Sequence, residues 1–262
     1  MKYGFLGCGN MGGAIAKALS KTTKDILLAS RSDRAEKLAA ALGCSYAKSN
    51  AELIGTCDVV FLAVKPQMAA DVLAPLVPAL QKYKPLLVSM AAGLTLQRIE
   101  AMAGGALPVV RIMPNTPVSI GNGMTTYCHN SLVDKAQVDS LLSDLRLAGY
   151  FDEVEETQMD AATAAAGCSP AYTYMFIDAI AQGAAACGLP REKALQYAAA
   201  AVSGAAQLLM ESGEEPTALR DAVCSPGGST IAGVRALEDE DFQATVMNAI
   251  RAAYNRNVEL GK

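Results

Sequence analysis

The sequence predicts an α/β protein in which a doubly wound parallel sheet precedes an all-α domain. Three observations predict it. Short apolar runs alternate with helical patterns over residues 1–155, as parallel strands joined by crossover helices do. A glycine-rich hexapeptide follows the first run. Residues 156–262 carry almost no strand pattern and contain about four or five alanine-rich helical segments. We therefore expect two domains, 1–155 and 156–262.

The strands of the expected sheet are short and apolar, as strands buried on both faces are. They are expected over residues 2–6, 25–30, 57–64, 85–89 and 108–112. A ribbon over 124–127 and a strand over 150–154 would complete the sheet. Helices are expected after the glycine turn, over 35–42, before each of the strands at 85 and 108, and over 135–147.

The hexapeptide Gly7-Cys8-Gly9-Asn10-Met11-Gly12 follows a strand and opens a helix, which is the context that a dinucleotide-binding turn requires. In this interpretation Gly7 makes the tight turn, Gly9 admits the pyrophosphate, and Gly12 lets helix and strand pack closely. A glycine turn without a ligand is the less favoured alternative. We expect a Rossmann-type cofactor site that includes Asn10 and Met11.

The end of the second strand indicates which cofactor binds. An NAD enzyme usually places Asp or Glu there, whereas this chain has Ser30, Arg31 and Ser32. A guanidinium and hydroxyls attract the 2′-phosphate, which a carboxylate would repel. The sequence therefore predicts that NADP(H) is preferred and that NAD(H) is possible, with the nearby Asp33 as the opposing feature.

Two further segments follow strands at the carboxyl edge of the sheet, where ligands bind in such folds. Ala63, Val64, Lys65 and Pro66 follow the third strand, and Lys65 is expected over the cofactor phosphates or ribose. After residue 112 two prolines hold a rigid loop whose Asn115 and Thr116 are expected to face the nicotinamide. Arg111 is equally compatible with a site role and with a structural ion pair.

A second glycine loop lies in the helical part of the chain. Residues 225–230 read Ser-Pro-Gly-Gly-Ser-Thr and lead into an apolar helical pattern. A loop that feeds a helix N-terminus presents unpaired N–H groups and a partial positive charge, which suit a small carboxylate. We expect the substrate to bind at Ser225, Gly227, Gly228, Ser229 and Thr230. An acid-binding loop together with a dinucleotide site indicates a reductase.

Composition narrows the class of protein further. The net charge is −4 and no Lys/Arg cluster stands out, so nucleic acid is not expected as a partner. Two uncharged stretches, 161–177 and 194–210, contain polar or helix-breaking residues and are expected to be buried helices, with no membrane span. Because these helices have little solvent face, we expect them to bury against a second copy in an obligate dimer.

Cysteine and histidine usage indicates a reduced compartment and no metal. Seven scattered cysteines, an odd number, and a strand that starts almost at once predict a cytoplasmic protein without a signal peptide. The single histidine, His129, has no cysteine cluster beside it, so no metal site is expected. His129 is expected to lie at the surface of an edge strand.

These motifs resemble those of the pyrroline-5-carboxylate reductases over essentially the whole chain. The resemblance is carried by Gly7 to Gly12 with Met11, by 63–67, 111–117, 170–172 and 188–190, and above all by 225–238. It implies reduction of L-1-pyrroline-5-carboxylate to L-proline with NAD(P)H, a dimer through the helical domain, and often a ring of dimers. It also implies that Ser225, Gly228, Ser229 and Thr230 hold the substrate carboxylate and ring nitrogen. Asn50, Lys65 and the turn at 30–32 would contact the cofactor.

The chain departs from the family at one helix start. The family commonly has Gly-Ser-Gly-Pro-Ala-Tyr where this chain has Gly-Cys-Ser-Pro-Ala-Tyr at residues 167–172. The helix start remains expected there, and the contacts of Cys168 and Ser169 are left open.

The expected chemistry needs no strong acid. A protonated cyclic imine already carries its activating proton, so the protein mainly aligns the reacting carbons and holds the carboxylate. Thr230 is the candidate for a hydrogen bond to the ring nitrogen, and capping of the following helix is its structural alternative.

Other functions of proteins with a similar architecture fit this sequence less well. A β-hydroxyacid dehydrogenase would need a lysine early in the helical domain, and residues 161–177 contain none. Another imine reductase of similar architecture stays open. A non-catalytic NADP(H) sensor would have no use for the loop at 225–230.

Overall fold

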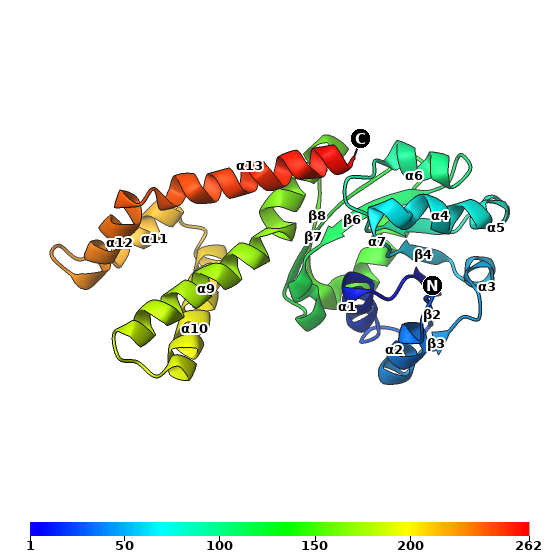
Figure 1. The fold of residues 1–262 in the computed structure, drawn as a ribbon. Helices are drawn as coiled ribbons and strands as arrows, with labels where there is room; N and C mark the ends of the chain where they lie inside the picture. Colours follow the sequence, from blue (N-terminus) through cyan, green and yellow to red (C-terminus); the bar gives the residue numbers. More distant parts are fainter. Residues whose placement is uncertain (262) are drawn as a thin grey trace. The chain divides into compact units, whose positions relative to one another are not determined.

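The computed structural model describes residues 1–261 and divides into two compact units (Figure 1). The first unit holds residues 1–168 together with 253–261, and the second holds residues 169–252. The compact units therefore part after Cys168, later than the boundary expected at 155/156, and the final helix belongs to both. The division into functional domains at 155/156 stays a prediction.

The first unit is built on one eight-stranded sheet in the order β3-β2-β1-β4-β5-β6-β7-β8. All neighbouring strands are parallel except β6 and β7. The predicted α/β class with a mostly parallel sheet is confirmed. The strands are β1 (Tyr3–Leu6), β2 (Ile26–Ala29), β3 (Ser45–Tyr46), β4 (Val59–Leu62), β5 (Leu86–Ser89), β6 (Val109–Pro114), β7 (Gly123–His129) and β8 (Gly149–Glu153).

The reversal at β7 has a simple cause. The connection from β6 to β7 consists of residues 115–122, and a parallel crossover needs a dozen residues or more. The chain therefore turns back and pairs β7 antiparallel to β6, with Ile112 opposite Tyr127. β8 then pairs parallel to β7. Apolar periodicity reports burial and not strand direction, so the sequence pattern did not show this reversal.

Both faces of the sheet are covered by helices, which explains why its inner strands are apolar throughout. Along β1, Tyr3 and Phe5 belong to the hydrophobic core on one face, and Leu6 belongs to the core on the other. Phe5 lies opposite Phe61 of β4, and their rings stack with centroids 4.4 Å apart. The core therefore holds β1 and β4 together at the centre of the sheet.

The helices of the first unit follow the strands in sequence. The α-helices are α1 (Asn10–Leu19), α2 (Arg34–Leu42), α3 (Asn50–Thr56), α4 (Ala69–Leu73), α5 (Val77–Tyr83), α6 (Leu96–Met102), α7 (Lys135–Leu145) and α8 (Met159–Ala162). Short 3-10 helices are η1 (Pro66–Met68), η2 (Ala74–Leu76), η3 (Thr116–Ile120), η4 (Arg146–Ala148) and η5 (Glu156–Gln158). A π-helix, η6 (Thr163–Gly167), ends the first unit.

The second unit is entirely helical in the described residues. It contains α9 (Ser169–Ala186), α10 (Arg191–Ser212), α11 (Pro216–Ala222), α12 (Ser229–Asp239) and most of α13 (Phe242–Leu260). The expected helix start is present, because α9 begins at Ser169. The last turns of α13 pack in the first unit, where the backbones of Gly93 and Gly261 meet.

The second unit has almost no core within a single chain. Its buried hydrophobic cluster consists of Ala181, Ala194 and Ala198. Large apolar side chains stay exposed, among them Tyr174, Met175, Tyr197, Met210 and Met247. Exposed apolar surface of this extent is typical of an interface that a partner covers. No helix in residues 1–261 combines the length and hydropathy that crossing a membrane would require.

One sequence-based expectation about the sheet was wrong. His129 ends β7, which lies between β6 and β8, and so it is not on an edge strand. Its side chain is partly buried, with Nε2 lying 3.3 Å from Oε1 of Glu153. Nδ1 lies 2.9 Å from the carbonyl oxygen of Asn130. The sequence pattern predicted both β7 and β8, but it did not show that β8 pairs on the outer side of β7 and forms the edge of the sheet.

Candidate functional site

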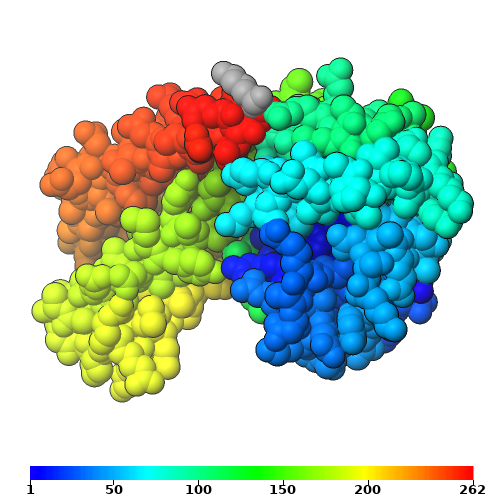
Figure 2. Space-filling model, turned by 45° about the vertical axis from the view of Figure 1, so that its right-hand side comes forward, coloured from blue at the N-terminus to red at the C-terminus, as the bar shows by residue number. Residues whose placement is uncertain are grey.

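The centre of the sheet contains the point where the strand order changes direction. β1 has β2 on one side and β4 on the other, so the loops after β1 and β4 diverge at their carboxyl ends. A cavity of about 430 Å³ lies there. In Figure 2 the dark blue N-terminal segment, to which the glycine turn belongs, is recessed between the blue and cyan segments. The cavity is lined by Leu6, Gly7, Cys8, Gly9, Ala29, Ser30, Arg31, Ser32, Arg34, Asn50, Ala63, Val64, Lys65, Met68 and Val72.

The three glycines of the hexapeptide differ in what surrounds them. Gly7 has φ +106°, and a Cβ there would lie 2.6 Å from the carbonyl oxygen of Ala63. At Gly12 a Cβ would lie 2.7 Å from the carbonyl oxygen of Gly7 and 2.8 Å from the Cβ of Ala63. At Gly9 a Cβ would meet nothing within 4 Å. Gly7 and Gly12 are therefore required by the fold, and Gly9 leaves open space at the cavity.

The backbone N–H groups in the first helical turn of α1 lie next to the glycine turn. Gly9 is the N-cap, with extended backbone, and its carbonyl accepts from the N–H of Gly13 at 2.8 Å. By helix geometry the N–H groups of Asn10, Met11 and Gly12 have no partner in the helix. These donors, together with the helix dipole, suit a phosphate group.

The loop after β2 is held by a serine. The hydroxyl of Ser30 donates to the carbonyl of Ser32 at 2.6 Å and accepts from the N–H of Ala35 at 3.1 Å. The guanidinium of Arg31 lies against the sulfur of Met68, at 3.7 Å. Ser30 thus shapes the loop and sets the start of α2, while Arg31 reaches across the cavity toward η1.

The cavity wall carries positive charge. Arg31, Arg34 and Lys65 line it, and none of its lining residues, all within the described part of the chain, is Asp or Glu. Asp33 does not line it, because its carboxylate pairs with Nζ of Lys37 at 2.5 Å on α2. A concave site with three cations and no acid attracts a ligand that carries several phosphate groups.

A cysteine forms part of the wall beside the glycine turn. Burial raises the pKa of the Cys8 thiol to about 11. Its Sγ lies 3.6 Å from the carbonyl oxygen of Ala29. The thiol is therefore protonated at neutral pH and is a weak nucleophile, so Cys8 packs as a small neutral group.

Nine of the fifteen residues predicted to bind the cofactor line this cavity. They are Gly7, Gly9, Ser30, Arg31, Ser32, Asn50, Ala63, Val64 and Lys65. The cavity lining does not include Asn10, Met11, Gly12, Pro66, Asn115 or Thr116. The lining residues that were not predicted are Leu6, Cys8, Ala29, Arg34, Met68 and Val72. The charge of Arg34 beside Arg31, and the spacing of Met68 and Val72 by one helical turn, were signals that could have found them.

Asn115 has a different task from the expected one. Its Oδ1 accepts from the N–H of Met124 at 2.9 Å, and its Nδ2 donates to the carbonyl of Ala166 at 3.1 Å. The side chain is buried. Its amide therefore ties the β6–β7 loop to β7 and to the π-helix, and does not point freely toward a nicotinamide. Thr116 begins η3 and is exposed.

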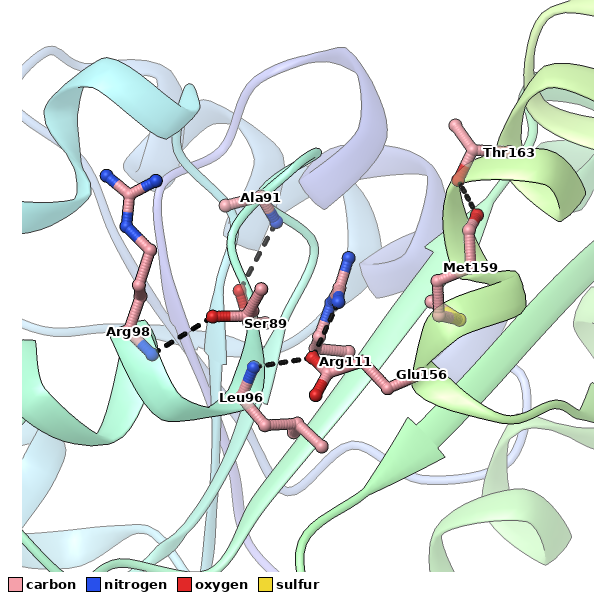
Figure 3. Close-up of polar contacts among 9 residues, drawn as sticks. Ser89, Ala91, Leu96, Arg98, Arg111, Glu156, Met159 and Thr163 are labelled. Carbon is pink, nitrogen blue, oxygen red and sulfur yellow. Dashed lines mark hydrogen bonds and ion pairs between the residues drawn. The ribbon is translucent and has the colours of Figure 1, made fainter. Parts of the chain in front are cut away.

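Arg111 forms the structural ion pair that was one of its two interpretations (Figure 3). Its Nη1 lies 2.7 Å from Oε1 of Glu156, and the same oxygen accepts from the N–H of Leu96 at 2.7 Å. The arginine side chain is 5% exposed and the glutamate 34%. One carboxylate thus joins β6, the first turn of α6 and η5.

We expect Glu156→Gln to lower the free energy of unfolding by about 1–3 kcal/mol, because the buried Arg111 guanidinium loses its counter-charge. Thermal and urea unfolding would measure this. Glu214→Gln, which removes an exposed carboxylate, is the matched control and should be neutral. Equal stability of both variants would contradict the role given to the ion pair.

The second glycine loop lies in the second unit. α12 begins at Ser229 with Gly228 as its N-cap, and no side chain caps it. The proposed capping role of Thr230 was therefore wrong, since Thr230 is the second residue of the helix. Gly227 has φ +72°, and the N–H of Gly228 donates to the carbonyl of Ser225 at 3.0 Å. This hydrogen bond closes a tight turn, and the positive φ at residue 227 is one that glycine adopts readily.

The loop presents donors without internal partners. Ser225, Ser229 and Thr230 are exposed, and their hydroxyls make no hydrogen bond within residues 1–261. By helix geometry the N–H groups of Ser229 and Thr230 also lack partners in α12. Hydroxyls and N–H groups gathered in one turn can bind a small carboxylate.

The fold and this pair of sites define a class of protein, the dinucleotide-dependent oxidoreductases with a Rossmann sheet. A family model described as "NADP oxidoreductase coenzyme F420-dependent" matches residues 2–93, and one described as "Pyrroline-5-carboxylate reductase dimerisation" matches residues 156–260. The pyrroline-5-carboxylate reductase of Escherichia coli K12 is 37% identical over 266 aligned positions, which cover 100% of this chain and 98% of the relative. The chain belongs to the pyrroline-5-carboxylate reductase family.

Solved structures agree with this assignment. The Plasmodium falciparum pyrroline carboxylate reductase, a structure with NADP bound, has a TM-score of 0.92 at 33% identity and covers 100% of this chain and 98% of its own. The Streptococcus pyogenes 1-pyrroline-5-carboxylate reductase has a TM-score of 0.91 at 37% identity, with coverage of 99% and 98%. The predicted family is confirmed, and the match to the dimerisation model supports a homo-oligomer.

Proposed function

We propose that this protein reduces L-1-pyrroline-5-carboxylate to L-proline with a hydride from NADPH. One observation carries the proposal beyond family membership. The chain combines a phosphate-attracting cavity at the switch point of the sheet with an exposed Ser-Pro-Gly-Gly-Ser-Thr turn that can hold a carboxylate.

The cofactor would be held by the residues around the cavity. The N–H groups at the start of α1 would bind the pyrophosphate, with Gly9 allowing close approach. Arg31 and Ser32 would contact the adenosine ribose and its 2′-phosphate. Lys65, Asn50 and the backbone of 63–64 would lie along the phosphates and ribose. The bound nicotinamide supplies the hydride.

The substrate would be held by the second loop. The N–H groups of Ser229 and Thr230 and the hydroxyls of Ser225 and Ser229 would bind its carboxylate, at the turn that Gly227 and Gly228 make. The hydroxyl oxygen of Thr230 would accept a hydrogen bond from the N–H of the protonated ring nitrogen. These groups are neutral, so they hold the acid without adding or removing a proton.

The protonation state of the substrate decides what else the protein must do. The imine enters with a proton on nitrogen, so the carbon of the C=N⁺ bond accepts the hydride pair and the π electrons move to nitrogen. The product is a neutral secondary amine, and no alkoxide forms that an acid would have to protonate. The protein therefore acts by alignment and by excluding other orientations.

Preference for NADPH over NADH is the second part of the proposal. It is supported by the three cations of the cavity and by the pairing of Asp33 with Lys37, which leaves Arg31 without a competing carboxylate in the loop. A guanidinium forms paired hydrogen bonds to a phosphate and gains little from a ribose hydroxyl.

Arg31→Ala is expected to raise the KM for NADPH by about 10- to 100-fold and the KM for NADH by less than about twofold, because only NADPH carries the 2′-phosphate. Absorbance of the reduced cofactor, followed with pyrroline-5-carboxylate as substrate and with proline identified as product, would measure both constants. Equal changes for the two cofactors would refute the preference. Tight NADPH binding without turnover in the unaltered protein would favour another cyclic imine or the sensor function.

We also propose a larger assembly and a cellular location for the protein. A ring of dimers is supported only by family resemblance, and the mass of the assembly in solution would test it. A cytoplasmic location is supported by seven free thiols, which persist in a reducing compartment. Secretion with disulfides formed would contradict it.

A further inference from the structure

A second arginine lines the cavity beside Arg31. Arg34 is the first residue of α2 and follows the loop that the Ser30 hydroxyl holds. Both arginines line the cavity, whereas Asp33 between them does not. The segment between β2 and α2 is the one that contacts the adenosine ribose in dinucleotide folds. Arg31 and Arg34 therefore both belong to the segment at the ribose end of the cavity, and the guanidinium of Arg31 extends from it to Met68.

Neither arginine has a carboxylate partner. The ion pairs within residues 1–261 include none to Arg31 or Arg34. Asp33 pairs with Lys37, and both of these side chains are largely exposed. Glu36, the other acid near the start of α2, is two residues from Arg34 and so projects from a different side of the helix. The charge of Arg34 is thus uncompensated.

The positive charge of Arg34 also interacts unfavourably with the dipole of α2. A cation in the first turn of a helix lies against the partial positive charge of the unpaired N–H groups. Arg34 therefore adds nothing favourable to α2 itself, and it stands near the like charge of Arg31. A dianionic group bound by both arginines would offset these two unfavourable interactions with charge-assisted hydrogen bonds.

We propose that Arg34 is a second specificity-determining residue, which binds the 2′-phosphate of NADP(H) together with Arg31. The inference rests on the proposed preference for NADPH and extends it to a two-arginine site. Ser30 holds the backbone that carries both arginines, because its hydroxyl connects the loop carbonyl of Ser32 to the N–H of Ala35 on α2.

The test is direct binding. Titration of NADPH and NADH, followed by nicotinamide fluorescence, suits a chain with no tryptophan. Arg34→Ala is expected to weaken NADPH about tenfold and to leave NADH within about twofold, as the loss of one charge-assisted hydrogen bond predicts. Adenosine 2′,5′-bisphosphate should lose affinity in parallel, and 5′-AMP should not. The melting temperature without ligand should stay equal or rise, because a cation leaves the helix start.

Controls separate this inference from its alternatives. Arg146→Ala removes an exposed arginine of the same unit away from the cavity and should leave both affinities unchanged. If Arg31→Ala is selective for NADPH and Arg34→Ala has no effect, the role of Arg34 is refuted and the proposed preference stands. If Arg34→Ala weakens both cofactors equally, the role of Arg34 is likewise overturned. Equal effects of Arg31→Ala on both cofactors would remove the preference itself.

Discussion

Gly9→Ala is expected to lower the affinity for NADPH by about a hundredfold or more, because close approach of the pyrophosphate to the turn is lost. The added methyl group would meet no protein atom within 4 Å and would occupy open space at the cavity. Gly9 has φ −73°, which alanine adopts without strain. The free energy of unfolding should therefore stay equal or rise by up to about 1 kcal/mol. Fluorescence titration and urea unfolding measure the two quantities.

Two neighbouring glycines provide matched controls. At Gly13 a Cβ would make an ordinary contact of 3.6 Å with Leu38, so Gly13→Ala should change neither quantity much. At Gly12 a Cβ would overlap Gly7 and Ala63, so Gly12→Ala should destabilise the fold by about 1–3 kcal/mol. Unaltered NADPH affinity in a folded Gly9→Ala protein would show that the cofactor does not approach this turn.

Thr230→Val is expected to lower kcat for pyrroline-5-carboxylate by about 10- to 100-fold, because one hydrogen bond to the reacting ring nitrogen is lost. The substitution keeps the shape of the side chain. Thr230 is exposed and is the second residue of α12, and the two residue types have similar helix propensity, so the fold should be unaffected. NADPH affinity should also be unchanged, since the cofactor is proposed to bind in the other unit.

Thr230→Ser is the informative companion, since it restores the hydroxyl and should recover most of the turnover. Ser229→Ala is expected to raise KM more than it lowers kcat, because Ser229 would bind the carboxylate in both ground and transition states. A fully active Thr230→Val protein, or a Thr230→Ser protein as slow as the valine variant, would remove Thr230 from the reaction.

The strands and the glycine turn could be predicted because their signals are local. The predicted strands overlap β1, β2, β4, β5, β6, β7 and β8. Buried parallel strands are apolar throughout, and the demands on Gly7 and Gly12 come from backbone contacts that any such turn makes. β3 was missed because it is two exposed residues, Ser45–Tyr46, with no apolar pattern.

Other features depend on contacts between residues that are far apart in the sequence. The direction of β7 follows from the length of its connection, and the place of His129 follows from β8 pairing outside it. Whether Arg111 served a site or an ion pair depended on Glu156, which is 45 residues away in the sequence. Asn115 was expected at the nicotinamide, and its amide instead bonds the backbone of Met124 and Ala166. None of these partners is visible in a local pattern.

The sequence by itself determined the fold class, the glycine turn, the family and the two loops that are proposed to bind cofactor and substrate. These depend on residue type and spacing along the chain, which backbone geometry converts directly into structure. Only the tertiary structure decided which cations share one cavity, that Arg34 joins Arg31 there, and that the amide of Asn115 belongs to the fold. The physical reason is that charge, burial and hydrogen bonding act through space. The distance between two residues in the folded protein does not follow from their separation in the sequence.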